Sequence, residues 1–363
     1  MLFVWAAFVG FILAMLALDM GVLQRDAHVV SMREALVRSA AWISLGLGFS
    51  IVVYFAYELQ WFGLGRAIDS VDGGINDGTL AATKYLTGYV VEQSLSVDNI
   101  FVMVTIFAYF GVAPRYQHRV LFWGIIGAMA MRGVMIVVGA ALIERFHWIL
   151  YLFGASLIVM GVRLFLIKTQ RPDLETNPIV RLVRRVIPVT AQFHGRHFFV
   201  RAGSLDAREP AVPGGVRCGD SVAEVARAGA LLMTPLGLAL IVVELSDLVF
   251  AVDSIPAVFA ITADPFLVFT SNVFAMLGLR SMYFALAGLL DRFRYLNASI
   301  SVVLVIVGAK MLVAPWLHGV LGRHANVYLL AIILVVLGWG VVVSLRGNAR
   351  TAPPMRGTGT DGP

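Results

Sequence analysis

The sequence predicts an all-α polytopic membrane protein with about nine transmembrane helices, which contain an inverted repeat of two three-helix units. The chain is 59% hydrophobic and 14% charged, with a mean hydropathy of +0.85, whereas a soluble domain carries about 25% charged residues. Apolar runs long enough to cross a bilayer recur along it. Two matching acidic motifs, which begin at Glu92 and Asp247, lie inside two of these runs.

The apolar runs give the predicted spans. The first run begins Met1-Leu-Phe-Val-Trp5 without a basic region before it, which favours an uncleaved span over a signal peptide. A transmembrane helix needs about 20 apolar residues. Runs of about that length or longer lie at 2–22, 40–62, 80–111, 118–142, 148–167, 230–260, 266–290, 297–315 and 326–345.

These spans divide the chain into six predicted regions. Each repeat holds three helices, an odd number, so the second must enter the membrane from the opposite side to the first. Inverted repeats of this kind place a substrate site near the membrane midplane, where the two units meet. The regions are two N-terminal helices with their loops (1–79), the first repeat (80–167), a cytoplasmic loop (168–229), the second repeat (230–316), the last helix (317–346) and a disordered cytoplasmic tail (347–363).

Landmarks outside the acidic motifs support the repeat. Both halves carry an arginine in the middle helix, at Arg132 and Arg280, and a glycine followed by a basic residue in the third. The third-helix pairs are Gly161-Val-Arg163 and Gly308-Ala-Lys310. With a single-residue gap these landmarks stay in register, so the two halves are predicted to share one three-helix design.

Loop charges predict the orientation. The loop 168–229 holds nine arginines and one lysine against six acidic residues, and basic loops face the cytoplasm. This places the N-terminus outside and the C-terminus in the cytoplasm. The basic residues lie between spans, so the high pI reflects topology. The expected surroundings are a lipid bilayer, and no nucleic acid partner is predicted.

The acidic motifs carry the chemistry. The first reads Glu92, five residues, Asp98, Asn99 and Ile100, and the second reads Asp247, five residues, Asp253, Ser254 and Ile255. A carboxylate in hydrocarbon costs about 3 kcal/mol or more and usually marks an ion pathway inside a bundle. The motifs therefore predict an ion site between the two repeats.

Six residues on a helix correspond to about 120° of rotation and 9 Å of rise, so the two acids of one motif do not chelate one ion together. Two pairings across the repeat are open. Either Asp98 meets Asp253, with Glu92 and Asp247 one layer away, or Glu92 meets Asp253 and Asp98 meets Asp247. Further oxygen ligands are predicted from Glu244, Asn99, Ser254 and Asn272.

An all-oxygen ligand set suits a hard divalent cation, Mn²⁺, Mg²⁺ or Ca²⁺. The only cysteine, Cys218, lies in a polar loop, which excludes a thiolate cluster. Arg132 and Arg280 are predicted to balance the carboxylate charge, and a purely structural role for these two arginines is the alternative. Exchange of protons for the metal is expected. Pro256 predicts a kink or an unwound turn near Asp253.

Three segments, Glu92–Phe101, Val243–Ile261 and Asp264–Tyr283, resemble the TerC family of bacterial integral membrane proteins, and within it the Alx-like branch. The resemblance extends from the first span to about residue 315 and includes His197–Arg201. It places the protein in the bacterial inner membrane. The functional residues that it carries over are Glu92, Asp98, Asn99, Glu244, Asp247, Asp253 and Asn272.

The resemblance implies secondary transport of metal ions, most often export of Mn²⁺, and a historical association with tellurite resistance. Tellurite itself is disfavoured as a substrate because an acidic site repels an oxyanion. No enzymatic activity and no permanently bound cofactor are expected. The main alternative is a membrane scaffold or metal-delivery subunit that docks a membrane or metalloprotein partner through loop 168–229.

Two enzyme classes are disfavoured by missing motifs. An intramembrane aspartyl protease would carry Gly-x-Gly-Asp, which is absent from the sequence. A nucleotide-driven pump would need a Gly-x-x-x-x-Gly-Lys-Ser/Thr loop, which is also absent.

Overall fold

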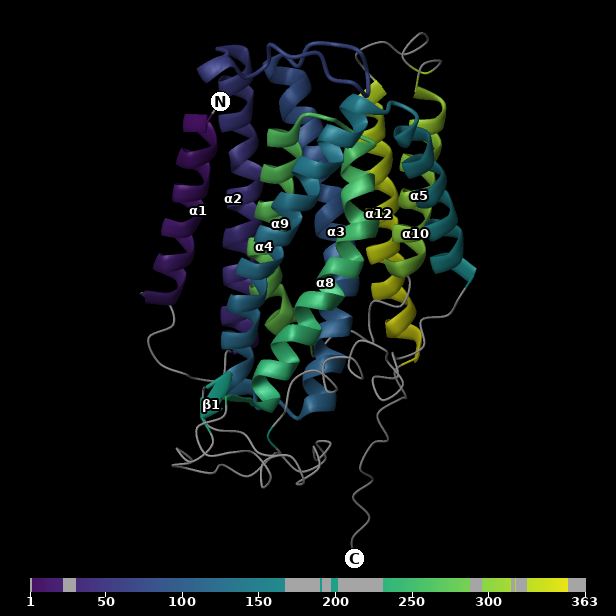
Figure 1. The fold of residues 1–363 in the computed structure, drawn as a ribbon. Helices are drawn as coiled ribbons and strands as arrows, with labels where there is room; N and C mark the ends of the chain where they lie inside the picture. The colour runs from purple at the N-terminus through teal and green to yellow at the C-terminus, as the bar shows by residue number, and fades with distance from the viewer. Residues whose placement is uncertain are drawn as a thin grey trace, which may run out of the picture.

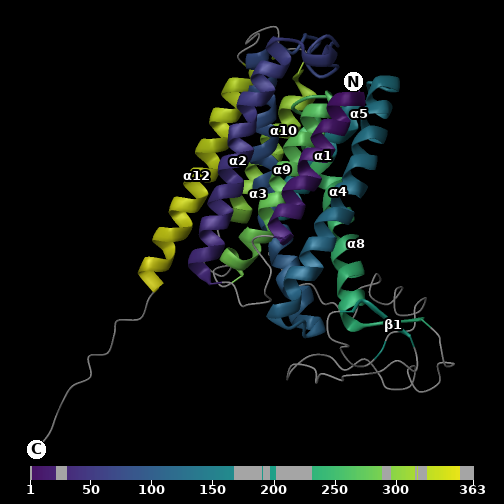
Figure 2. The ribbon, with the colours of Figure 1, turned by 90° about the vertical axis from the view of Figure 1, so that its left-hand side faces the viewer.

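The structure is a computed structural model that describes residues 2–21, 31–166, 190, 197–201, 231–287, 296–314, 317 and 325–351. Its helices form one elongated bundle with their axes nearly parallel (Figures 1 and 2). Most of the predicted loop 168–229 and the predicted tail from residue 352 lie outside the described residues. The described α-helices are α1 (Leu2–Gly21), α2 (Met32–Glu58), α3 (Gly78–Phe110), α4 (Pro114–Arg145), α5 (Ile149–Leu166), α8 (Pro235–Phe259), α9 (Pro265–Leu286), α10 (Leu296–Leu312) and α12 (Ala325–Thr351).

The predicted fold class is confirmed: the described chain is mostly helical, and each predicted span has its helix. Seven of these helices are long and apolar enough to cross a membrane, while the apolar parts of α1 and α10 are shorter. Helix α2 begins eight residues before its predicted span. Ser31 caps it by accepting a hydrogen bond from the Glu34 amide, and Glu34 pairs with Arg38 at 2.6 Å. This polar first turn extends the helix beyond the apolar run.

Side-chain caps fix where the central helices begin. Asp77 accepts a hydrogen bond from the Leu80 amide at the start of α3 (2.8 Å). Thr234 and Asp264 cap α8 and α9 in the same way, and each is followed by a proline at the first helical position. Polar caps of this kind satisfy backbone amides that would otherwise be orphaned at the bundle ends.

The two ends of the bundle differ. One end, which we call the Asp69 end, carries the 59–77 connection with the short 3₁₀ helix η1 (Trp61–Gly63) and the 260–264 turn. The other, the loop end, carries β1 (Phe199–Arg201) and β2 (Leu231–Met233). In Figure 1 the chain begins at the Asp69 end, and α12 runs toward the loop end. The described termini therefore lie at opposite ends, and which end faces the cytoplasm stays a prediction.

Helices α3 and α8, which carry the two acidic motifs, run in opposite directions. Helix α3 starts at the Asp69 end and descends to the loop end in Figure 1, whereas α8 rises from the strands at the loop end. The two strands pair antiparallel, with Phe199 opposite Met233, directly before α8. An element of sheet at this point was not predicted, and it delays the start of α8 to Pro235.

Helix α9 forms the centre of the bundle. Every residue from Phe266 to Ser281 is buried, because α2, α3, α4 and α8 surround it. Trp5 of α1 adds an edge-to-face contact with Phe266. A helix buried on all sides must satisfy its polar side chains within the protein, which places Asn272 and Arg280 among protein partners.

The packing between the two predicted repeats is reciprocal. Helix α3 packs on α9 and α8 packs on α4, while α5 packs on α10. Along the last pair, Gly154 faces Gly308, and Gly161 faces the Ser301 carbonyl, so that an added Cβ at Gly161 would lie 2.7 Å from that oxygen. Reciprocal contacts of this kind are expected of an inverted repeat, which stays a prediction here.

The prediction of an unwound turn at Pro256 is wrong. Helix α8 continues through Pro256 and ends at Phe259. Every residue from Ser254 to Phe259 is buried, so neighbouring helices hold this segment although proline removes one backbone hydrogen bond. The backbone is therefore helical on both sides of Asp253.

Candidate functional site

Five polar side chains from four helices meet in the middle of the bundle around one guanidinium group. Helix α4 supplies Arg132, which is 1% exposed. It donates hydrogen bonds to acceptors on α3, α8 and α9, and all of these residues are buried. We call this group the Arg132 cluster: Glu92, Arg132, Asp247, Ser254 and Asn272.

The guanidinium binds Asp247 with two hydrogen bonds, from Nε to Oδ2 at 3.2 Å and from Nη2 to Oδ1 at 3.0 Å. Its Nη1 contacts Glu92 Oε1, Ser254 Oγ at 3.2 Å and Asn272 Oδ1 at 3.0 Å. Charge-assisted bidentate contacts of this type are stronger than neutral hydrogen bonds. One arginine therefore joins the first acids of both motifs.

Three buried side-chain oxygens on α3 have no hydrogen-bond partner among the described residues: Oε2 of Glu92, Oε1 of Gln93 and Oγ of Ser96. Ser96 lies one helical turn after Glu92, so both side chains share a face of α3. Asn272 is oriented by its own helix, since its Nδ2 donates to the Val268 carbonyl at 2.9 Å and its Oδ1 is left to accept. Buried unpaired oxygens are uncommon and call for an explanation.

Neither predicted pairing of acids is seen, because the acids brought together are Glu92 and Asp247. Asp98 and Asp253 each lie six residues further along helices that run in opposite directions. They are therefore displaced toward opposite ends, by about 9 Å each. Both are partly buried, and Asn99 is buried beside Asp98. The carboxylates form a series along the bundle axis rather than one cluster.

Consistent with this arrangement, no three His, Cys, Asp or Glu side chains in the described part of the chain are close enough to hold a metal ion together. The central carboxylates come as a pair, with neutral oxygens from Ser254 and Asn272. A divalent ion at this position would have two charged ligands.

Glu244 lies one turn before Asp247 on α8 and packs against Gly127 of α4. A Cβ added at Gly127 would come within 2.0 Å of Glu244 Oε1, so only glycine leaves room for this carboxylate. The Oε2 atom of Glu244 has no hydrogen-bond partner among the described residues. The predicted ligand Glu244 therefore lies beside α4, on the loop-end side of Asp247.

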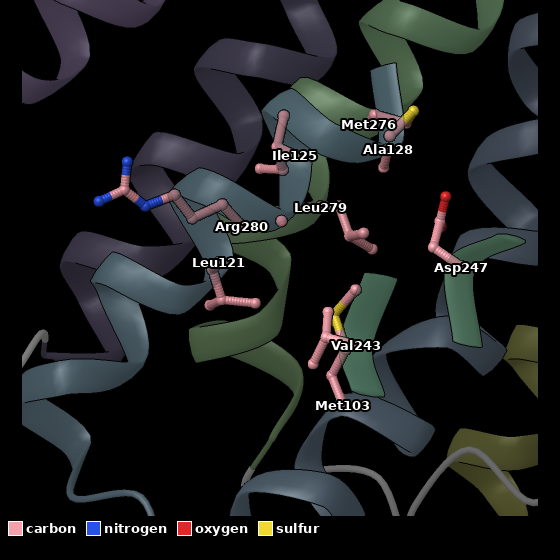
Figure 3. Close-up of a pocket in the computed structure, with 10 residues that line it drawn as sticks. Met103, Leu121, Ile125, Ala128, Val243, Asp247, Met276, Leu279 and Arg280 are labelled. Atoms are coloured by element: carbon pink, nitrogen blue, oxygen red, sulfur yellow. The ribbon is translucent and has the colours of Figure 1, made fainter. Parts of the chain in front are cut away.

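The second predicted charge-balancing residue, Arg280, is also buried but faces elsewhere. Its guanidinium carbon lies 5.9 Å from the centre of the Phe122 ring. Figure 3 shows the Arg280 head group pointing away from Asp247. The two arginines that correspond in the predicted repeat thus have different surroundings.

A small cavity of about 10 Å³ lies next to Asp247 (Figure 3), which is about the space that one water needs. On each helix its lining residues lie between the Arg132 cluster and the loop end. The cluster is therefore approached by a cavity from the loop-end side. The residues that line it are Met103, Leu121, Gly124, Ile125, Ala128, Val243, Asp247, Met276, Leu279 and Arg280.

On the opposite side the helices pack tightly. An added Cβ at Gly139 would lie 2.7 Å from the Phe259 ring, and one at Gly88 would lie 3.0 Å from Ser271 Oγ. The helices are therefore closely packed at these two points between the Arg132 cluster and the Asp69 end.

A second buried polar group closes the Asp69 end, and sequence analysis missed it. Lys84 of α3 is fully buried and donates to Asp69, Asp72 and Asn76 at 2.6–2.7 Å. Asp69 also accepts from Thr262. The signal in the sequence was a lysine inside a span directly after an acid-rich loop. We call this group the Lys84 cluster: Asp69, Asp72, Asn76, Lys84 and Thr262.

Comparison with known proteins identifies relatives over nearly the whole chain. The family model described as "Integral membrane protein TerC family" matches residues 77–352. A Myxococcus xanthus protein named "Uncharacterized membrane protein STKORF319" is 43% identical over 96% of this chain and 93% of its own length. "Putative membrane-bound redox modulator Alx" of Escherichia coli K12 is 41% identical over 86% of this chain and 87% of its own. No solved structure matches the chain.

Proposed function

The chain belongs to the integral membrane protein TerC family, and on that premise we propose that it is a secondary transporter that exports divalent metal cations, Mn²⁺ first among them, across the bacterial inner membrane. The observation that supports this most is the convergence of Glu92 and Asp247. Two carboxylates from helices of opposite direction meet in the middle of a membrane bundle, where acids are costly and usually mark an ion pathway. Ser254 and Asn272 add the neutral oxygens that hard cations accept.

Access to these carboxylates supports a direction of transport. The small cavity lies on the loop-end side of Asp247, and the loop charges predict that end to be cytoplasmic. The close contact at Gly139 and the Lys84 cluster lie on the other side. This is the arrangement that an exporter needs when it takes up its cargo from the cytoplasm, and proton exchange remains part of the proposal.

Asp98 and Asp253 fit the proposal as acids on either side of the central pair. A cation that moves along the axis would pass from the region of one to the region of the other through Glu92 and Asp247. Spaced acids allow an ion to leave as well as to bind, because no single position holds it with all of the charge.

The alternative, a scaffold or metal-delivery subunit, involves loop 168–229, of which the structure describes only a few residues. The names of some relatives refer to redox modulation. This chain has one cysteine, so a redox role would require a partner that supplies a second thiol or another redox group.

The test is Mn²⁺ flux into proteoliposomes under a pH gradient, for wild type, Glu92→Gln and Asp247→Asn. We expect either substitution to reduce flux at least about tenfold, since losing one charged ligand in a buried site costs more than 1.4 kcal/mol. Glu144→Gln, which removes an exposed carboxylate of α4, is the control and should transport normally. Wild-type protein that is folded but moves no Mn²⁺ would favour the scaffold, and loss of a partner on deletion of loop 168–229 would then identify it.

A further inference from the structure

We infer that Arg132 is an internal counter-cation that occupies the ligands of the transported metal, so that metal binding and the contacts of Arg132 exclude each other. The inference rests on the proposed function and adds a residue that regulates its site. The guanidinium would hold Glu92 and Asp247 while the carrier is empty and leave them when a metal ion arrives.

The contacts of Arg132 are the first support. It binds four of the oxygen-bearing side chains predicted as metal ligands, through the very oxygens that would face an ion: Glu92, Asp247, Ser254 and Asn272. Both oxygens of Asp247 are used by the guanidinium, at 3.0 and 3.2 Å. A metal ion at this position would compete with the guanidinium for these oxygens.

Charge is the second support. Two ionised carboxylates this far from water need a cation, because an uncompensated buried charge is strongly unfavourable. Arg132 supplies one positive charge and a divalent ion would supply two. Both together would repel each other at short range in a medium of low dielectric constant. The site is therefore suited to one cation at a time, either the guanidinium or the metal.

The place to which Arg132 can withdraw is the third support. Glu244 packs on α4 at Gly127, five residues before Arg132, and its Oε2 has no partner among the described residues. Glu244 also lies one turn, about 4.5 Å along α8, from Asp247, whose carboxylate the guanidinium binds. The cavity lies on the same side and is lined there by Gly124 and Ala128. Glu244 is thus the acceptor that the guanidinium meets when it leaves Asp247.

The experiment measures the Kd for Mn²⁺ on purified full-length protein by calorimetry, for wild type, Arg132→Gln and Arg132→Lys. Removal of the competing cation should lower the Kd about tenfold or more in Arg132→Gln, while flux falls because the empty carrier loses its counter-charge. Lysine keeps the positive charge but lacks the several N–H donors of the guanidinium. The Kd of Arg132→Lys should therefore lie between those of wild type and Arg132→Gln. A Kd that is unchanged or raised in both variants would overturn the inference.

Two additions separate this role from a structural one. In Arg132→Ala, free guanidinium ion should raise the Kd for Mn²⁺, whereas wild type should not respond. Glu244→Gln should raise the Kd in wild type but not in the Arg132→Gln background, because it acts through Arg132; equal effects in both backgrounds would make Glu244 a direct ligand instead and refute the withdrawal step.

The failure of the proposed function looks different from the failure of this inference. Absence of Mn²⁺ binding to wild type and to every folded variant overturns the transport proposal and the inference with it. Binding to wild type together with no gain on removal of Arg132 overturns only the inference. If Arg132→Gln does not fold, Arg132→Lys still gives the deciding comparison with wild type.

Discussion

Two buried basic side chains, Arg132 in the middle of the bundle and Lys84 near the Asp69 end, each pair with two carboxylates, but their surroundings differ. Asp69, beside Lys84, also accepts hydrogen bonds from Thr262 and from the Ala263 amide at 2.9 Å. The Arg132 cluster instead leaves Oε2 of Glu92 without a partner among the described residues. Among the described residues, the polar atoms of the first network are all paired, whereas the second network is incompletely satisfied.

The elements that supply the partners differ as well. The partners of Lys84 all come from the 59–77 connection, and the α8–α9 turn joins the network through its hydrogen bonds to Asp69. Arg132 is held by three separate helices, and its partner Asp247 lines a cavity. Satisfied buried networks make a structure rigid and specific, whereas an unpaired buried oxygen calls for an explanation. On the proposed function, the comparison predicts that Lys84 mainly stabilises the fold and that Arg132 takes part in transport.

The largest expected effect is on stability. Lys84→Met leaves Asp69 and Asp72 without their cation, and breaking a buried pair in this way costs about 3–5 kcal/mol. We expect a clear drop in Tm in detergent, with flux per folded molecule close to wild type. Arg145→Met, at an exposed position at the end of α4, should leave Tm nearly unchanged. An unaltered Tm for Lys84→Met would remove the distinction between the two clusters.

The second-largest expected effect is a loss of stability in acid, through the Lys84 cluster. Burial tends to raise the pKa of Asp69, but the charge of Lys84 and hydrogen bonds from Lys84, Thr262 and Ala263 outweigh it and hold the pKa below its ordinary value. A carboxyl of this kind stabilises the fold above its unfolded pKa of about 3.9 and loses that contribution as pH falls through the lower folded pKa.

The corresponding measurement is Tm against pH for wild type and Asp69→Asn. Asp69→Asn should have a lower Tm than wild type at neutral pH. The difference in Tm should become smaller as the pH falls below about 4, because both proteins then lack the negative charge at position 69. Glu144→Gln serves to correct for the general effect of acid on the bundle. A gap that stays constant with pH would show that the charge of Asp69 contributes little.

The smallest expected effect tests whether Glu244 accepts the guanidinium of Arg132. Gly127→Ala brings a Cβ against Glu244, whereas at Gly124 the added Cβ would lie 3.5 Å from Val243, an ordinary contact. If Glu244 receives Arg132, Gly127→Ala should raise the Kd for Mn²⁺ by roughly threefold to tenfold, equivalent to about 1 kcal/mol. Gly124→Ala is the matched control on the same helix, and equal effects of the two substitutions would argue against a special position for Glu244.

Hydropathy predicted each described helix, and most of the limits agree within a few residues: the runs at 2–22 and 80–111 became Leu2–Gly21 and Gly78–Phe110. Membrane helices are predictable because their backbone hydrogen bonds are local and their length is set by the bilayer. The start of α2 was missed because its first turn is polar and lies outside the apolar run.

The sequence by itself determined which charged residues lie within the membrane-spanning segments, since Glu92, Arg132 and Asp247 lie inside long apolar runs. Only the tertiary structure decided that Arg132 joins Glu92 to Asp247, that Arg280 lies against Phe122, and that Lys84 closes the Asp69 end. The reason is physical: composition and spacing fix length and order along the chain, but the rotation and depth of each helix follow from packing against its neighbours. Which residue a side chain meets on a neighbouring helix depends on both the rotation and the depth of the two helices.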